Sequence, residues 1–100
     1  MTLYEILNKD LDIPLTYKRI KDPINPPFIA YIGIGQARMF ADDTVYVKEN
    51  RYRLEYYFTK KDEELEDKLE NTLLANGYIY SKSEDIFIES ENVFIIYYEI

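Results

Sequence analysis

The sequence predicts an α+β fold, a mostly antiparallel sheet with two helices packed on one face, in the order α-β-β-β-α-β-β. Leucines recur at helical spacing in residues 2–11 and 62–75, and the stretches between and after them are rich in valine, isoleucine, tyrosine and phenylalanine. Short polar connections between neighbouring strands favour antiparallel pairing. The length of 100 residues is enough for one domain, residues 1–100, and not for two.

The first helix is predicted over residues 2–11. Thr2 and Glu5 have the spacing of a capping box, in which each side chain bonds the other residue's backbone amide. Pro14 cannot continue a helix, so we expect the helix to end near Asp12. One face of this helix carries the apolar residues Leu3, Ile6, Leu7 and Leu11.

Three strands are predicted before the second helix. Residues 18–27 hold three of the four prolines, which indicates a rigid extended connection or, alternatively, a PxxP-type ligand. Residues 28–34, FIAYIGI, are typical of a strand that is buried on both faces. Residues 44–48 and 52–59 alternate in polarity, and the intervening Glu49-Asn50-Arg51 indicates a tight turn that makes them a hairpin.

The second helix has the clearest signals. Either Thr59 or Asp62 can cap its start, and leucines at positions 65, 69 and 73 define its apolar face. Asn76-Gly77 is a typical left-handed stop. In the last quarter, residues 78–80 lead into two or three strands, and residues 86–88 and 93–100 flank a polar connection that is suited to a hairpin.

The pair Gly33-x-Gly35 invites comparison with phosphate-binding loops. A dinucleotide fingerprint needs a third glycine at position 38 and a helix that begins there, but position 38 is Arg38 and no long helical pattern follows. No Gly-Lys-Ser/Thr follows either, so the pattern does not match a P-loop. We therefore expect a bulge or close approach at the end of a strand, followed by an exposed loop.

Composition argues against an enzyme and predicts no catalytic residue, cofactor or metal. The chain has no cysteine and no histidine, so thiol nucleophiles, the commonest general base and the commonest metal ligand are all absent. Asp42-Asp43, with Glu49 or Glu55 nearby, could hold a hard cation, but these acids do not have the spacing of a calcium-binding loop. A second group of acids, Glu84, Asp85, Glu89 and Glu91, could supply a carboxylate pair, although so small a domain offers little cleft for a sugar.

The charge and hydropathy of the chain bear on its partners. The formal net charge is −7, and the basic residues lie singly or in pairs close to acids, so tight binding to nucleic acid is not expected. No apolar run reaches the length of about 18 residues that a membrane-spanning helix needs, and the N-terminus lacks the basic region of a secretory signal.

A candidate protein–protein interface is predicted instead. Eleven tyrosines are compatible with a strand-rich core and with interfaces, where tyrosine is enriched. Arg38-Met39-Phe40 places two large apolar residues in the expected loop, where they either fold back over the core or project into a partner. The predicted interface residues are Arg38, Met39, Phe40, Tyr46 and Tyr57.

Four stretches of the sequence resemble small prophage proteins of Gram-positive bacteria that are encoded among the head–tail joining and tail genes. They are residues 26–31 (PPFIAY), 42–44 (DDT), 49–57 (ENRYRLEYY) and 83–91 (SEDIFIESE). The order of elements is also similar to that of tail-terminator and tail-completion proteins of long-tailed phages. The resemblance implies a non-enzymatic α+β subunit that assembles as a ring, commonly a hexamer, at the end of the tail.

This resemblance also implies the setting of the protein. Its partners would be copies of itself and phage tail-tube or connector proteins, with no small-molecule substrate, in the virion or in the host cytoplasm during assembly. An alternative is a small acidic regulatory or host-directed phage protein that binds one partner, including proteins that mimic DNA. Acids in residues 62–70 supply part of the phosphate-like ladder that mimicry needs.

Overall fold

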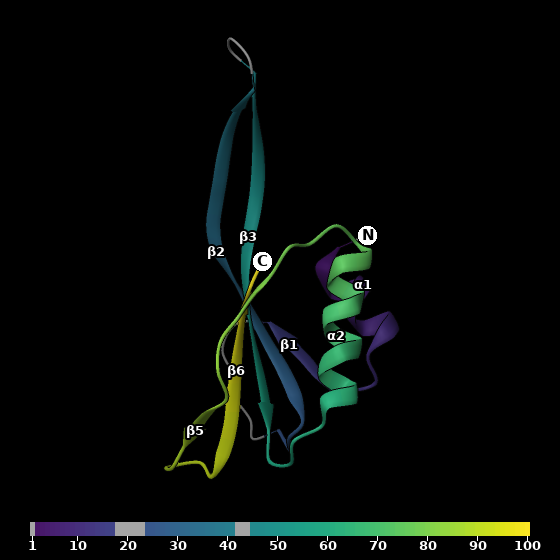
Figure 1. Cartoon of the computed structure of the whole chain (residues 1–100), viewed down its shortest axis with the longest axis vertical. Coiled ribbons are helices and arrows are strands. Elements are labelled where there is room, and N and C mark those ends of the chain that lie inside the picture. The colour runs from purple at the N-terminus through teal and green to yellow at the C-terminus, as the bar shows by residue number, and fades with distance from the viewer. Residues whose placement is uncertain (1, 18–23, 42–44) are drawn as a thin grey trace.

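The computed structural model describes residues 2–17, 24–41 and 45–100, and for residues 37–41 and 45–49 it describes the backbone alone. Its elements are α1 (Leu3–Asp10), β1 (Leu15–Tyr17), β2 (Phe28–Ala41), β3 (Val45–Phe58), α2 (Glu63–Ala75), β4 (Ser81–Lys82), β5 (Ile86–Ile88) and β6 (Val93–Glu99). Both helices pack on one face of the sheet (Figure 1). The predicted α+β class and the predicted order of elements are confirmed.

The sheet is antiparallel except at one edge. Its strand order is β1-β2-β3-β6-β4, and β5 also pairs with β6. Among the strands that the structure describes, only β1 and β2 are parallel, with Leu15 beside Ile29. The predicted C-terminal hairpin is confirmed as β5 and β6, in which Ile88 pairs with Val93.

Both helices form where their local signals predict. The capping box of α1 is present, and the Glu5 amide donates to Thr2 Oγ1 at 3.2 Å. Of the two candidate caps for α2, Asp62 is the one used, and it accepts from the Leu65 amide at 3.1 Å. Gly77 ends this helix with φ of +84°, a conformation that glycine adopts without steric cost.

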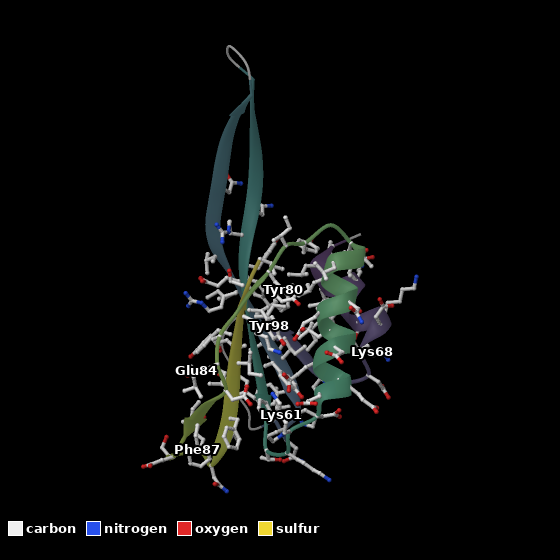
Figure 2. The ribbon with its side chains drawn as sticks, viewed as in Figure 1. Lys61, Lys68, Tyr80, Glu84, Phe87 and Tyr98 are labelled. Atoms are coloured by element: carbon white, nitrogen blue, oxygen red, sulfur yellow. The ribbon has the colours of Figure 1, made fainter. Side chains whose placement is uncertain are left out.

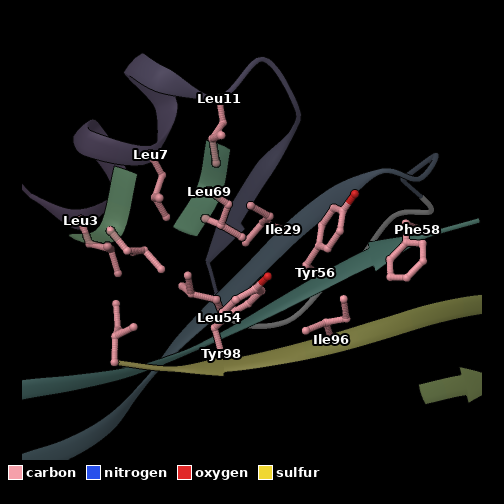
Figure 3. Close-up of a cluster of buried hydrophobic side chains, with 12 residues drawn as sticks. Leu3, Leu7, Leu11, Ile29, Leu54, Tyr56, Phe58, Leu69, Ile96 and Tyr98 are labelled. Atoms are coloured by element: carbon pink, nitrogen blue, oxygen red, sulfur yellow. The ribbon is translucent and has the colours of Figure 1, made fainter. Parts of the chain in front are cut away.

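The core lies between the helices and the lower half of the sheet (Figure 3). Leu7, Leu54 and Leu73 are completely buried, and the large rings of Tyr56 and Tyr98 are almost completely so. The buried cluster comprises Leu3, Leu7, Leu11, Ile29, Leu54, Tyr56, Phe58, Leu69, Leu73, Ile96, Tyr98 and Ile100. Its members from β2 and β3 are Ile29, Leu54, Tyr56 and Phe58, so these strands extend well beyond it.

The prediction for residues 28–59 was wrong in three respects. Arg38–Phe40 lie in strand β2 and not in a loop, because β2 continues to Ala41. Glu49-Asn50-Arg51 is not a turn, because β3 is one strand of 14 residues. Residues 28–30 are buried as predicted, but Ile34 is 37% exposed.

The physical reason for this error is the environment of the two strands. Ala37 pairs with Glu49, Gln36 pairs with Asn50, and the Gln36 amide donates to Asn50 Oδ1 at 2.8 Å. A strand that no helix or further strand covers tolerates polar residues on both faces, so its sequence resembles a turn. The predicted bulge is confirmed, because the register of β2 and β3 shifts between Gly33 and Gly35.

Candidate interaction surface

The upper half of the β2–β3 pair stands away from the rest of the molecule (Figure 1). Strand β1 pairs with β2 only as far as Tyr31. Strand β6 pairs with residues 53–58 of β3, and Ile100, directly after β6, exchanges backbone hydrogen bonds with Tyr52. Beyond these points, residues 35–41 and 45–51 pair only with each other in the part of the chain that the structure describes. We call these two segments the arm. The molecule measures 51 × 25 × 24 Å as a result.

An arm of this kind is a surface without a partner. An isolated two-stranded hairpin is marginally stable in water at best, because it has no further strand or helix to pack against. Both of its edges also present unpaired backbone amides and carbonyls, which are templates for contact with another chain. The described part of the arm therefore presents two exposed backbone edges and two faces that no other described element covers.

The register of the arm gives it two different faces. Directly paired residues of an antiparallel ribbon share a face, and successive residues alternate between faces. One face, which we call the cationic-aromatic face, combines the pairs Gln36–Asn50, Arg38–Lys48 and Phe40–Tyr46. The opposite face combines the pairs Gly35–Arg51, Ala37–Glu49, Met39–Val47 and Ala41–Val45, which are small or aliphatic apart from Arg51 and Glu49.

Four of the five predicted interface residues belong to the arm. Arg38, Phe40 and Tyr46 share the cationic-aromatic face, and Met39 lies on the opposite face. The spacing in the sequence suggested a loop with an apolar tip, whereas the structure gives a ribbon with two distinct surfaces. The acids Asp42-Asp43, considered above for a metal, lie outside the described residues.

Tyr57 lies elsewhere. It is 11 residues from Tyr46 along the same strand, which corresponds to roughly 35 Å. Its ring stacks on Phe28 with a centroid distance of 4.6 Å, and its hydroxyl donates to Glu55 at 2.9 Å. Burial and this hydrogen bond raise the pKa of Tyr57 above its ordinary value. It is therefore a fixed part of the sheet face opposite the helices.

The base of the arm is a glycine bulge. Gly35 has φ of +104°, which side chains rarely adopt, and a Cβ added there would meet no atom within 4 Å. A bulge bends a strand and increases its twist. Because the register shifts here, the bulge determines the direction in which the arm leaves the sheet.

A second polar constellation joins α2 to the edge of the sheet, and sequence reasoning missed it. Glu66 is only 3% exposed, and Lys61 Nζ lies 2.8 Å from one of its carboxylate oxygens and 2.9 Å from the other. Lys82 Nζ from β4 lies 3.0 Å from Glu66 and 2.7 Å from Glu70. Figure 2 shows Lys61 and Tyr98 in this region, between α2 and the strands.

Glu70 completes this network. It accepts hydrogen bonds from the hydroxyls of Tyr98 at 2.7 Å and Tyr80 at 3.1 Å. Burial alone would raise the pKa of Glu70, but the hydrogen bonds from Lys82 and Tyr98 outweigh burial and hold it below its ordinary value. Burial and the bond to Glu70 raise the pKa of Tyr98.

This network has the features of a structural hydrogen-bond and ion-pair network that holds α2 against the sheet. Three of the four carboxylate oxygens of Glu66 and Glu70 accept hydrogen bonds from lysines or tyrosines. The fourth, Glu66 Oε2, has no hydrogen-bond partner among the described residues but is buried 2.8 Å from Lys61 Nζ, so the ion pair accounts for it. The sequence signal was Glu66 and Glu70 at i,i+4, one helical turn apart beside the buried Leu69 and Leu73.

The described residues offer little for small-molecule chemistry. A groove of about 730 Å³ on α1 and α2 is lined by charged side chains including Lys9, Asp10, Glu64 and Lys68, whereas ligand pockets are mostly apolar. In the described ranges, no three acidic, histidine or cysteine side chains gather as a metal site would require. Neither described helix is long and apolar enough to cross a membrane.

Comparisons with known proteins give no assignment: no family matches the chain, and neither curated proteins nor solved structures yield a match.

Proposed function

We propose that the protein is a non-enzymatic structural subunit of a phage or prophage, of the head–tail joining or tail-completion type, that assembles as a ring at the end of the tail. The observation that carries this proposal is the arm, a two-stranded ribbon without a partner that projects from a compact α+β body. Its partners would be neighbouring copies, in the hexameric ring that the resemblance implies, and the tail-tube or connector protein. It would act in the virion and, during assembly, in the host cytoplasm.

Two further properties support the role. A ring subunit needs a heterologous interface, in which one surface of each copy fits a different surface of the next copy. An arm at one end of an elongated subunit is suited to such a contact. The net charge of −7 disfavours adhesion to DNA. A protein on the path of a passing genome requires such weak adhesion.

Mimicry of DNA receives less support. That function needs a continuous ladder of exposed acids, and residues 62–70 were the best candidate. Glu66, in the middle of this stretch, is buried and paired with Lys61 and Lys82, and Glu70 is paired with Lys82. The ladder is therefore interrupted on the helix that would have to carry it.

Removal of the arm tests the proposal. In the variant, residues 37–49 are replaced by Asn-Gly, a sequence that favours a two-residue hairpin turn, at the Gln36–Asn50 pair. We expect this chain to keep the helical part of its circular dichroism and its thermal unfolding midpoint, because the described core lies below the arm. We expect it to lose self-association, measured by light scattering over a wide concentration range, and docking to purified tail-tube protein.

The contrary outcomes are equally clear. An arm-deleted chain that assembles and docks like the wild type would refute the proposed role of the arm. A wild-type chain that neither self-associates nor docks to tail-tube protein would refute the structural function and favour a regulatory protein that binds one partner.

A further inference from the structure

We propose that the cationic-aromatic face of the arm docks on the β5–β6 hairpin of a second copy of the chain. This inference rests on the proposed self-assembly and adds the surface that receives the arm. We call residues 84–92 the acceptor hairpin. It combines exposed apolar side chains with a surplus of acids, and the arm face combines aromatic residues with cations.

The apolar part of the acceptor hairpin is Ile86 and Phe87. Their side chains are 36% and 47% exposed, although large apolar residues in a strand are usually covered. Phe87 lies against Phe94 with ring centroids 5.0 Å apart, so it is held in place at the surface (Figure 2). Because successive strand residues alternate between faces, Ile86 and Phe87 lie on opposite faces of β5. Phe87, with Phe94 beside it, is therefore the exposed apolar centre of one face of the hairpin.

The charged part of the acceptor hairpin is acidic. Glu84, Glu89 and Glu91 are exposed, and residues 84–92 contain no lysine or arginine. Asp85 is already paired with Lys61 at 3.0 Å, so it contributes less to attraction of a second chain. The three glutamates therefore give the chain segment on either side of Phe87 a negative charge.

The arm carries the complementary set. Arg38 and Lys48 occupy paired positions, and Phe40 and Tyr46 form the next pair on the same face. The described pairs of this face contain no acid, in a chain whose acids outnumber its bases by 19 to 12. Complementary charge around an aromatic centre is the usual composition of a specific interface, because it excludes wrong partners and accelerates encounter.

The shape of the subunit makes this a contact between copies. The arm and the acceptor hairpin lie at opposite ends of the long axis, which measures 51 Å (Figure 1). An arm therefore cannot reach the hairpin of its own chain. Successive contacts of this head-to-tail kind close into a ring when each step includes a suitable rotation.

Charge reversal tests the pairing. The arm variant is Arg38→Glu/Lys48→Glu, and the acceptor variant is Glu84→Lys/Glu89→Lys. Each alone is expected to weaken self-association by at least about tenfold, because like charges would then face each other. An equimolar mixture of the two is expected to assemble again, because each arm then fits the hairpin of the other chain. Matched controls on the helices, Lys9→Glu/Lys68→Glu and Glu63→Lys/Glu64→Lys, are expected to assemble like the wild type.

Cross-linking detects the contact between the arm and the acceptor hairpin even where association is weak. The chain has no cysteine, so Lys48→Cys in one copy and Glu89→Cys in another provide the only thiols. Under mild oxidation we expect this pair to form a disulfide faster than the control pair Lys48→Cys and Lys68→Cys. Equal rates for the two pairs would overturn the proposal.

The outcomes separate this inference from the function on which it rests. Loss of assembly in the arm variant but not in the acceptor variant would overturn the acceptor assignment and leave the arm as the assembly element. Loss of docking to tail-tube protein in the arm variant, with self-association intact, would assign the arm to that partner and also overturn the inference. A mixture of the two charge-reversed variants that stays unassembled would also overturn the inference that the arm docks on the acceptor hairpin.

Discussion

Glu66 is a carboxylate buried between two lysines, and its surroundings explain how a charge is tolerated there. Burial of an unpaired charge is costly, and a pair compensates only when its geometry and hydrogen bonding are good. Lys61 and Lys82 contact both oxygens of Glu66 while their own side chains remain 42% and 33% exposed. The lysines thus stay partly hydrated while they neutralise the buried acid. They come from the loop before α2 and from β4, so the network ties three separate segments together.

Two buried tyrosines on the same face of the sheet give a matched test of this network. Tyr98 donates to Glu70 at 2.7 Å, whereas the Tyr56 hydroxyl has no hydrogen-bond partner among the described residues. Tyr98→Phe is expected to lower the free energy of unfolding by about 1–3 kcal/mol, because it removes a bond to a charged group. Tyr56→Phe is expected to leave it unchanged or to raise it by up to about 1 kcal/mol, because an unsatisfied buried group is removed.

Urea unfolding of the wild type and both variants measures this difference. The two substitutions remove the same atom from rings that are both 1% exposed or less, so loss of packing contributes equally to both. Equal destabilisation by the two substitutions would show that the hydrogen bond to Glu70 has no net effect on stability.

The lowered pKa of Glu70 predicts a specific dependence of stability on pH. A carboxylate with a lowered folded-state pKa contributes stability above its unfolded-state value, near 4.5, and loses that contribution as pH falls through the folded-state value. Stability should therefore decline in acid below this value, because the unfolded state then binds more protons. Glu70→Gln should be less stable at neutral pH and show a shallower decline in acid.

The control for this prediction is Glu63→Gln, an exposed change on the same helix. It should reproduce the wild-type dependence of unfolding free energy on pH. Some acid dependence should remain in Glu70→Gln, because the hydrogen bonds of Thr2 lower the pKa of Glu5 as well. Parallel curves for Glu70→Gln and the wild type would show that Glu70 is not the responsible group.

At the level of elements, the helices could be predicted from the sequence and the long strands could not. Helix signals are local: Thr2, Asp62 and Gly77 each act on backbone groups within one turn. Strand length depends instead on partners that are distant in the sequence, as Asn50 shows by pairing with Gln36. Strand β1 was missed for the same reason, because its three residues are a strand only beside β2.

The candidate site was partly predictable for a related reason. Large apolar and cationic residues at positions 38–40 and 46 stood out because they lay outside any predicted core. Their assembly into two faces depends on the register of β2 with β3, which the sequence does not specify locally. The acidic surplus of the acceptor hairpin was visible in the sequence, but its exposed apolar centre required the structure.

The glycine bulge gives a prediction at this level. Gly35→Ala is expected to lower the free energy of unfolding by about 1–2 kcal/mol, because alanine is strained at φ of +104°. Gly33→Ala is the matched control. Its added Cβ would lie 3.8 Å from Tyr17 Oη, an ordinary contact, at a position without a positive φ, so it should cost much less. Chemical unfolding of both variants measures the difference.

The consequence for function follows from the position of the bulge. If Gly35→Ala also straightens β2, the arm would leave the sheet in another direction and assembly would weaken beyond the loss of stability. A Gly35→Ala chain as stable as the Gly33→Ala chain would show that the bulge tolerates side chains and does not constrain the arm.

For the whole molecule, the decisive property is that the two ends of its long axis differ. The arm lies at one end of the long axis, and the acceptor hairpin lies at the other (Figure 1). An interface between two unlike ends is heterologous, so in the proposed assembly every subunit would both give and receive an arm. A two-fold symmetric dimer would instead join the same surface of both copies.

The difference between the two ends predicts how the arm-deleted chain should affect assembly of the wild-type chain. A deleted chain can receive an arm but cannot give one, so a single copy interrupts a ring. With one deleted chain in about ten and random mixing, roughly half of six-copy rings would remain intact, whereas about four fifths of two-fold dimers would be wholly wild type. Native mass spectrometry of mixtures over a range of ratios distinguishes the two curves. A loss in simple proportion to the deleted chain would exclude ring closure through the arm, because a closed ring must fail as a high power of the intact fraction.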